Sequence, residues 1–122
     1  MAANLLVVDD EAHIQDVLEQ LFCDAGYQVS TASDGGQAID LLEQREGSLE
    51  ALITDLELGQ GPSGWDVALR ARVLHPRLPI IYITGGSGHR WPPAWAPDGV
   101  TMLKPFACDH MVAVVSGLLQ AR

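Results

Sequence analysis

The feature that most restricts the fold of this chain is an alternation of short apolar runs with longer segments of helical periodicity. The first run, residues 5–8, is continuously hydrophobic and stops at the acidic triplet of residues 9–11. Such a run is typical of a strand that is buried on both faces of a parallel sheet. Apolar residues then recur at three- and four-residue spacing from Ile14 to Ala25, which predicts an amphipathic helix that ends before Gly26.

The same alternation continues through most of the remaining sequence. It predicts further strands at residues 27–31, 49–54, 79–83 and 100–103, and further helices at residues 65–74 and 108–120. Another helix is expected between Asp34, as its N-cap, and Arg45 near its end. Strands that alternate with helices define an α/β fold, in which right-handed crossovers place helices on both faces of a parallel sheet.

One segment breaks this alternation. Between the fourth and fifth expected strands, residues 87–99 contain three prolines and two glycines. Proline lacks an amide donor and fixes φ, and glycine is a poor helix former, so a regular helix is not expected there. We therefore expect the fourth helix of the alternation to be short or replaced by a loop.

Length and composition limit the class of protein. The 122 residues match one domain, 1–122, and the hydrophobic fraction of 48% is sufficient for a core. A formal net charge of −9 argues against binding to nucleic acid, and no apolar run is long enough to span a membrane. The cysteines, Cys23 and Cys108, are far apart, which is typical of reduced thiols in the cytoplasm. The four histidines, among them His75, have no ligand spacing and are expected on the surface or on helix faces.

Polar residues follow the expected strands at the edge where open α/β sheets bind ligands. Asp9 and Asp10 follow the first strand and Asp55 follows the third. Thr84 follows the fourth strand, and the only lysine, Lys104, follows the fifth. Carboxylates that share a pocket repel one another unless a cation is present, and Mg²⁺ suits a few carboxylates with water and phosphate. The pattern predicts a site that receives a phosphoryl group on an aspartate, with the lysine charge meeting a phosphoryl oxygen.

The same residues also have ordinary structural interpretations. Asp9, Asp10 and Glu11 can form an acidic N-cap that the helix dipole favours, and Asp55 can be a turn residue. Two carboxylates directly after a buried strand exceed what a cap needs. Lys104, placed directly before a proline at a strand end, is the strongest single indication of a functional site.

Four short motifs carry a resemblance to a known family. They are VVDDE at residues 7–11, ITDL at 53–56, ITG at 83–85 and LKPF at 103–106. With these motifs, in this order and each at an expected strand end, the chain resembles a response-regulator receiver domain of bacterial two-component signalling over essentially its whole length. The resemblance implies a flavodoxin-like, doubly wound parallel sheet of five strands in the order 2-1-3-4-5.

The resemblance also implies the roles of individual residues. Asp55 would be the phosphoacceptor, Thr84 would hydrogen-bond the phosphoryl group, and Lys104 would pair with the phosphoryl oxygens. Asp10 and Asp55 would bind Mg²⁺ directly, together with the backbone carbonyl of Glu57.

Asp9 would complete the acidic pocket and contact the metal through water. The implied function is a phosphorylation-dependent switch whose donor is a sensor histidine kinase or a phosphotransfer protein. The phosphorylated form would bind a downstream protein that the sequence does not identify. The chain is expected to be a cytoplasmic monomer or weak dimer, and to have no enzymatic activity beyond gaining and losing its own phosphoryl group.

Two departures from the receiver pattern, Thr101 and the irregular residues 87–99 in place of a fourth helix, keep other functions open. Thr101 stands where many receivers carry a tyrosine or phenylalanine that changes rotamer on phosphorylation. A phosphate-independent binding module is therefore one alternative. A small Mg²⁺-dependent phosphatase of the haloacid-dehalogenase type is another, but such enzymes carry a second aspartate where this chain has Glu57.

Overall fold

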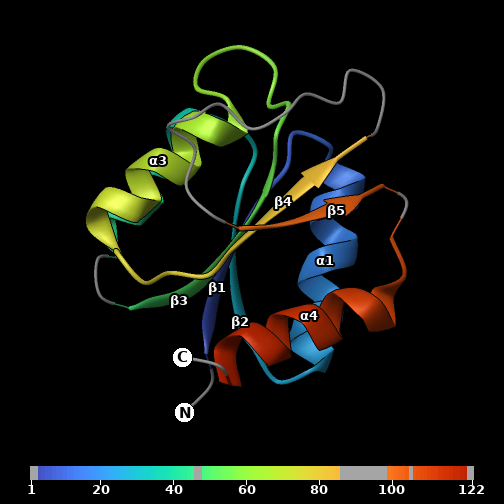
Figure 1. Cartoon of the computed structure of the whole chain (residues 1–122). Coiled ribbons are helices and arrows are strands. Elements are labelled where there is room, and N and C mark those ends of the chain that lie inside the picture. The colour runs from blue at the N-terminus through green and yellow to red at the C-terminus, as the bar shows by residue number, and fades with distance from the viewer. Residues whose placement is uncertain (1–2, 46–47, 86–98, 105, 121–122) are drawn as a thin grey trace.

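Five parallel strands form one sheet in the order β2-β1-β3-β4-β5 (Figure 1). The computed structural model describes residues 3–45, 48–85, 99–104 and 106–120. The strands are β1 (Asn4–Val8), β2 (Gln28–Ala32), β3 (Leu49–Asp55), β4 (Ile80–Thr84) and β5 (Val100–Leu103). The predicted fold class and strand order are confirmed. The predicted irregular stretch between the fourth and fifth strands, residues 87–99, lies outside the described residues except for Gly99.

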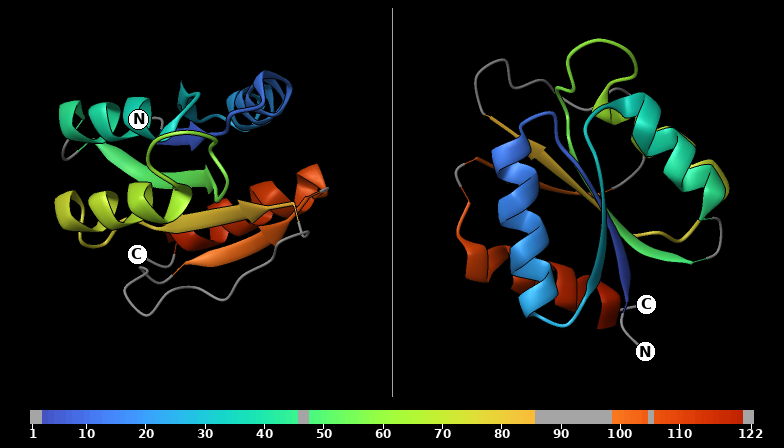
Figure 2. Two further views of the ribbon diagram at one scale, coloured as in Figure 1. Left: turned by 90° about the horizontal axis from the view of Figure 1, so that it is seen from above. Right: turned by 180° about the vertical axis from the view of Figure 1, so that it is seen from behind.

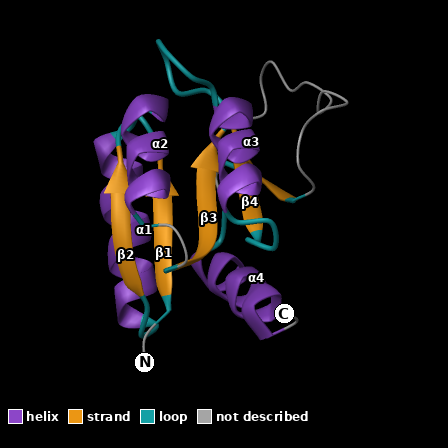
Figure 3. Cartoon of the chain, turned by 90° about the vertical axis from the view of Figure 1, so that its left-hand side faces the viewer, coloured by secondary structure: helices purple, strands orange, loops and turns teal. Residues whose placement is uncertain are grey.

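The described helices form a layer on each side of this sheet (Figure 2). They are α1 (Ala12–Asp24), α2 (Gly35–Gln44), α3 (Gly64–Leu74) and α4 (Cys108–Gln120). Helices α1 and α4 share one core with the sheet, and α2 and α3 share the other. Figure 3 shows β2, β1, β3 and β4 side by side, with α2 and α3 on the near side. Among the described residues, no helix has the length and hydropathy that a membrane span requires.

Residues 5–8 of the interior strand β1 are all apolar because helices cover both faces of the sheet. Leu5 and Val7 belong to the core beneath α1 and α4, whereas Leu6 and Val8 belong to the core beneath α2 and α3. All four side chains are fully buried. This arrangement explains why the strand reads as a continuous hydrophobic run rather than as an alternating one.

Side-chain caps fix the first turns of α2 and α3, which lie beside the carboxyl edge of the sheet. Asp34 caps α2, as predicted, by accepting a hydrogen bond of 2.8 Å from the Gln37 amide. At α3, the Ser63 hydroxyl accepts from the Asp66 amide at 3.3 Å, and the Asp66 carboxylate accepts from the Ser63 amide at 2.9 Å. These reciprocal bonds satisfy amides that would otherwise have no partner at the start of the helix.

The boundaries of several elements differ by one or two residues from those predicted. The strands β3 and β4 each extend one residue further than predicted, so that Asp55 and Thr84 are their last residues. His75 was expected on the surface or on a helix face, but it is the C-cap residue that follows α3 and it is buried. The His75 Nε2 atom lies 3.4 Å from the carbonyl oxygen of Leu42 on the neighbouring helix α2, which gives the buried ring a polar contact.

Candidate functional site

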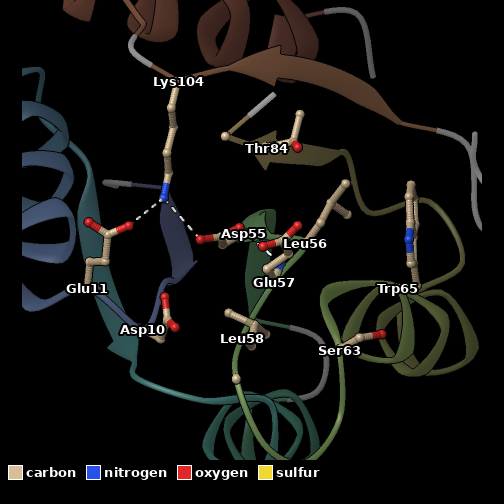
Figure 4. Close-up of a pocket in the computed structure, with 12 residues that line it drawn as sticks. Asp10, Glu11, Asp55, Leu56, Glu57, Leu58, Ser63, Trp65, Thr84 and Lys104 are labelled. Atoms are coloured by element: carbon tan, nitrogen blue, oxygen red, sulfur yellow. Dashed lines mark hydrogen bonds and ion pairs between the residues drawn. The ribbon is translucent and has the colours of Figure 1, made fainter. Parts of the chain in front are cut away.

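The carboxyl edge of the sheet brings together the polar side chains predicted from the sequence. Asp9 directly follows β1, Asp55 and Thr84 end β3 and β4, and Lys104 directly follows β5. The strands are parallel, so these four residues emerge at the same edge. A cavity of about 690 Å³ opens there, and Asp55, Thr84 and Lys104 are part of its wall (Figure 4). Trp65 lies across this cavity from Lys104.

Lys104 is the cation at the centre of the acidic residues. Its Nζ atom lies 3.0 Å from Asp55 Oδ2, 3.0 Å from Asp9 Oδ2 and 3.3 Å from Glu11 Oε1. Burial acts to lower the pKa of Lys104, but the carboxylates of Asp55 and Asp9 outweigh burial, so the pKa is raised above its ordinary value. The ammonium group therefore keeps its charge and offsets part of the repulsion between the carboxylates.

Asp9 is the most deeply buried carboxylate of the cavity region, with no exposed surface. Its Oδ1 atom accepts a hydrogen bond of 2.9 Å from the Glu11 amide. Its Oδ2 atom forms the ion pair with Lys104 but accepts no well-oriented hydrogen bond from the described residues. Burial raises the pKa of Asp9, and the charge of Asp55 adds to the rise, while the Glu11 amide and Lys104 oppose it.

Asp55 is held at both of its carboxylate oxygens. The Glu57 amide donates a hydrogen bond of 3.0 Å to Oδ1, and Lys104 donates one of 3.0 Å to Oδ2. Only 5% of Asp55 is exposed, yet its side chain reaches the cavity (Figure 4). Its carboxylate therefore has a fixed orientation and access to a group that enters the cavity.

Asp10 and Thr84 occupy different parts of the same wall. Asp10 is exposed, whereas Thr84 is 4% exposed at the end of β4. The main-chain amide of Lys104 donates a hydrogen bond of 2.8 Å to the Thr84 carbonyl. This bond connects the end of β4 to the residue that follows β5.

The acidic residues of this edge form an oxygen-rich group that suits a hard divalent cation. Asp9, Asp10, Glu11 and Asp55 each offer one carboxylate oxygen, and these four atoms lie within 4.8 Å of one another. The single charge of Lys104 does not balance four carboxylates. Oxygen ligands at partial exposure, with room for water and phosphate, are the donor set that Mg²⁺ prefers. The residues present therefore fit a magnesium ion.

Two cavity residues were not recognised as functional from the sequence. Glu11 is the third carboxylate that contacts Lys104. Its position directly after Asp9 and Asp10 is the sequence feature that could have indicated this role. Trp65 lines the cavity from the start of α3, and its ring centroid lies 4.6 Å from that of the buried Tyr82. No short-range pattern indicates this contact, because it depends on how α3 packs over β4.

Comparison with known proteins agrees with this geometry. Residues 5–116 match the response regulator receiver domain family. A response regulator receiver protein from Sinorhizobium medicae WSM419 has a similar structure, with 36% sequence identity and a TM-score of 0.89 over 98% of this chain and 96% of that chain. The receiver domain of the hybrid histidine kinase CckA is 26% identical, with a TM-score of 0.82 over 97% of this chain and all (100%) of that domain. The chain therefore belongs to the receiver domains of response regulators.

The curated relatives are longer than this chain. The uncharacterized transcriptional regulatory protein YrkP of Bacillus subtilis is 32% identical over 98% of this chain and 51% of its own length. The response regulator SaeR of Staphylococcus epidermidis is 33% identical over 66% of this chain and 34% of its own length. The chain thus spans about half of YrkP, and its match to SaeR covers about a third of that protein.

Membership of this family gives the general chemistry of the site. Receiver domains interact with histidine kinases or phosphotransfer proteins in two-component systems, and they bind Mg²⁺ at an acidic pocket. They are in general not enzymes in the ordinary sense.

Proposed function

We propose that this domain is a phosphorylation-dependent switch whose phosphoacceptor is Asp55. The observation that carries the proposal is the fixed Asp55 carboxylate, which is bonded at one oxygen by the Glu57 amide and at the other by Lys104. Asp55 also lies at the wall of a cavity that can admit a phosphoryl group. A nucleophile with a fixed orientation needs little reorganisation before it attacks.

The proposed donor is the phosphohistidine of a sensor histidine kinase or of a phosphotransfer protein. One Asp55 oxygen forms a bond to phosphorus while the bond between phosphorus and the donor imidazole nitrogen breaks. The nitrogen keeps the electron pair of the broken bond and takes up a proton. Lys104, which already contacts Asp55, stabilises the negative charge of the phosphoryl oxygens during the transfer.

The acidic residues are proposed to serve the metal. Asp10, Asp55 and the backbone carbonyl of Glu57 would hold Mg²⁺, and Asp9 would contact it through water. When bound, Mg²⁺ would neutralise charge on the phosphoryl oxygens. The chemistry that we propose for this chain is limited to the gain and loss of the phosphoryl group at Asp55.

Thr84 and Lys104 are proposed to transmit the phosphorylated state. The Thr84 hydroxyl would donate a hydrogen bond to a phosphoryl oxygen, and the main-chain bond from Lys104 to Thr84 couples that movement to β5. The result would be a shift between two populations with different affinity for a downstream protein. We place this exchange in the cytoplasm, where free cysteines such as Cys23 and Cys108 persist, and propose a monomer or weak dimer.

Intact mass spectrometry after incubation with Mg²⁺ and acetyl phosphate tests the proposal. Wild type should gain one phosphoryl group, and it should gain none when Mg²⁺ is absent. Asp55→Asn should gain none, whereas Asp40→Asn, which changes an exposed carboxylate of α2, should behave as wild type. Equal uptake by Asp55→Asn would contradict the assignment of the phosphoacceptor. No uptake by wild type, from acetyl phosphate or from a phosphorylated kinase, would favour a phosphate-independent binding module.

A further inference from the structure

The loop that follows Asp55 packs against the first turn of α2 at a point where no side chain fits. Gly35 is the first residue of α2 and is buried. A β-carbon at this position would lie 2.8 Å from the Pro62 β-carbon and even closer to the Pro62 carbonyl oxygen. Non-bonded carbon atoms do not pack at that separation, so any larger residue at position 35 must displace the backbone at Pro62.

The same loop carries the groups that set the orientation of Asp55. The Glu57 amide donates to Asp55 Oδ1, and the Glu57 carbonyl belongs to the proposed metal site. Leu58 is 3% exposed and belongs to the core beneath α2 and α3. Gly59 has a φ of 72°, a left-handed conformation that favours glycine, and its backbone passes beside Asp10. The position of this loop therefore affects three of the proposed metal ligands.

The C-terminal end of the loop has little room to absorb a displacement. The Gly64 amide donates a hydrogen bond of 3.0 Å to the Leu56 carbonyl, which closes the loop at its base. A β-carbon on Gly64 would lie 2.7 Å from the Leu56 α-carbon, so the two ends of the loop are in close backbone contact. Because this base is closed, we expect a shift at Pro62 to pass along the loop towards Glu57.

We propose that Gly35 is a positioning residue for the phosphoacceptor site. By leaving space for Pro62, it fixes the loop whose Glu57 amide orients Asp55 and whose Glu57 carbonyl would bind the metal. The part that concerns the metal rests on the proposed function. The part that concerns the Glu57 hydrogen bond to Asp55 does not, because that bond is a direct contact between two residues of the chain.

The neighbouring glycine provides a matched control. A β-carbon on Gly36 would meet only the Asp34 Oδ1 atom, at 3.4 Å. Gly35→Ala and Gly36→Ala both place a better helix former in the first turn of α2, but only the first displaces Pro62. We expect calorimetry to show that Gly35→Ala binds Mg²⁺ roughly 10- to 100-fold more weakly than wild type, the usual cost of disturbing groups that orient metal ligands. Gly36→Ala should bind Mg²⁺ as wild type does.

The amide resonance of Glu57 in the metal-free protein provides a second measurement. In Gly35→Ala this amide should lose its hydrogen-bonded chemical shift and exchange faster with solvent, whereas Gly36→Ala should leave it unchanged. If Gly35→Ala does not fold, Pro62→Gly provides the second variant: it removes the proline ring that packs on Gly35 without adding a clash, so the loop loses this support and both effects should appear. The proposal would be overturned if Gly35→Ala folds and has the same Mg²⁺ affinity and the same Glu57 amide resonance as wild type. If Gly35→Ala does not fold, the same result for Pro62→Gly would overturn it. If wild type itself binds no Mg²⁺, the proposed metal site fails, and the Glu57 amide alone decides the role of Gly35.

Discussion

The ammonium nitrogen of Lys104 lies 3.0 Å from the Oδ2 atom of Asp55, although 49 residues separate the two in sequence. The same nitrogen lies 3.0 Å from Asp9, which has no exposed surface. One cation therefore links the proposed phosphoacceptor at the cavity wall to a carboxylate that is fully buried. This arrangement makes the stability of the metal-free protein and its affinity for a metal depend on the same side chain.

Replacing Lys104 with methionine should destabilise the metal-free protein and strengthen Mg²⁺ binding. Removing one partner of a buried ion pair leaves an uncompensated charge, which costs roughly 3 kcal/mol of unfolding free energy. Loss of the positive charge also removes repulsion towards the metal. Urea unfolding without Mg²⁺ and calorimetric titration with Mg²⁺ measure the two effects. Arg77→Met, which removes an exposed cation, should change neither. A Lys104→Met protein with weaker Mg²⁺ binding would contradict this account.

Asp9→Asn should stabilise the metal-free protein at neutral pH. Because the native pKa of Asp9 is raised above 3.8, the native state binds more protons than the unfolded chain between these two pKa values. The contribution of Asp9 to the unfolding free energy therefore falls as pH rises through this interval and stays low at pH 7. Urea unfolding should show Asp9→Asn to be more stable than wild type at pH 7, with the difference shrinking towards pH 4. A variant that is less stable than wild type at pH 7 would show that Asp9 stabilises the fold as a charged group.

Magnesium should raise the thermal stability of wild type through the carboxylate cluster. A ligand that binds only the native state at about 100 times its Kd adds about 2.7 kcal/mol to the unfolding free energy. Asp10→Asn should lose most of this gain, because it removes an exposed carboxylate that is proposed to bind the metal. Asp16→Asn, on the exposed face of α1, should retain it. Melting curves with and without Mg²⁺ make the comparison, and an equal gain in Asp10→Asn would exclude Asp10 as a ligand.

Thr84→Ala should still take up the phosphoryl group. The structural change that follows phosphorylation should, however, reach β5 only weakly. The variant keeps Asp55 and Lys104 and loses the γ-methyl group and the hydroxyl that is proposed to contact the phosphoryl group. Amide chemical shifts in β4 and β5, recorded before and after phosphorylation, should change less in Thr84→Ala than in wild type. Thr84→Ser keeps a hydroxyl and should restore the change. If the chemical-shift changes in Thr84→Ala were as large as in wild type, another group would carry the structural change to β5.

The strand ends of the site could be predicted because each depends on residues close in sequence. Asp55 follows a buried apolar run, and parallel strands bring their ends to one edge of the sheet. The contacts between loops could not be predicted in this way. Gly35 meets Pro62 only because the loop after β3 crosses the start of α2, and two adjacent glycines in the sequence do not reveal which one is constrained.

The contacts of the aromatic residues could not be predicted from the sequence either. Thr101 marks the absence of the aromatic residue expected on β5, but the sequence does not reveal its neighbour across the sheet. In the structure, Tyr82 of β4 is the register partner of Thr101 and packs against Trp65. Register and helix packing, rather than local periodicity, determine this pair.

The most direct test of the central claim locates the phosphoryl group within the chain. Borohydride reduces an aspartyl phosphate to homoserine and leaves free carboxylates unchanged, so peptide mass spectrometry identifies the phosphorylated residue. After incubation of wild type with Mg²⁺ and acetyl phosphate, the account predicts homoserine at position 55 and at no other acidic position. Homoserine at position 9, 10 or 11, or its absence from position 55 in protein that has gained a phosphoryl group, would contradict it.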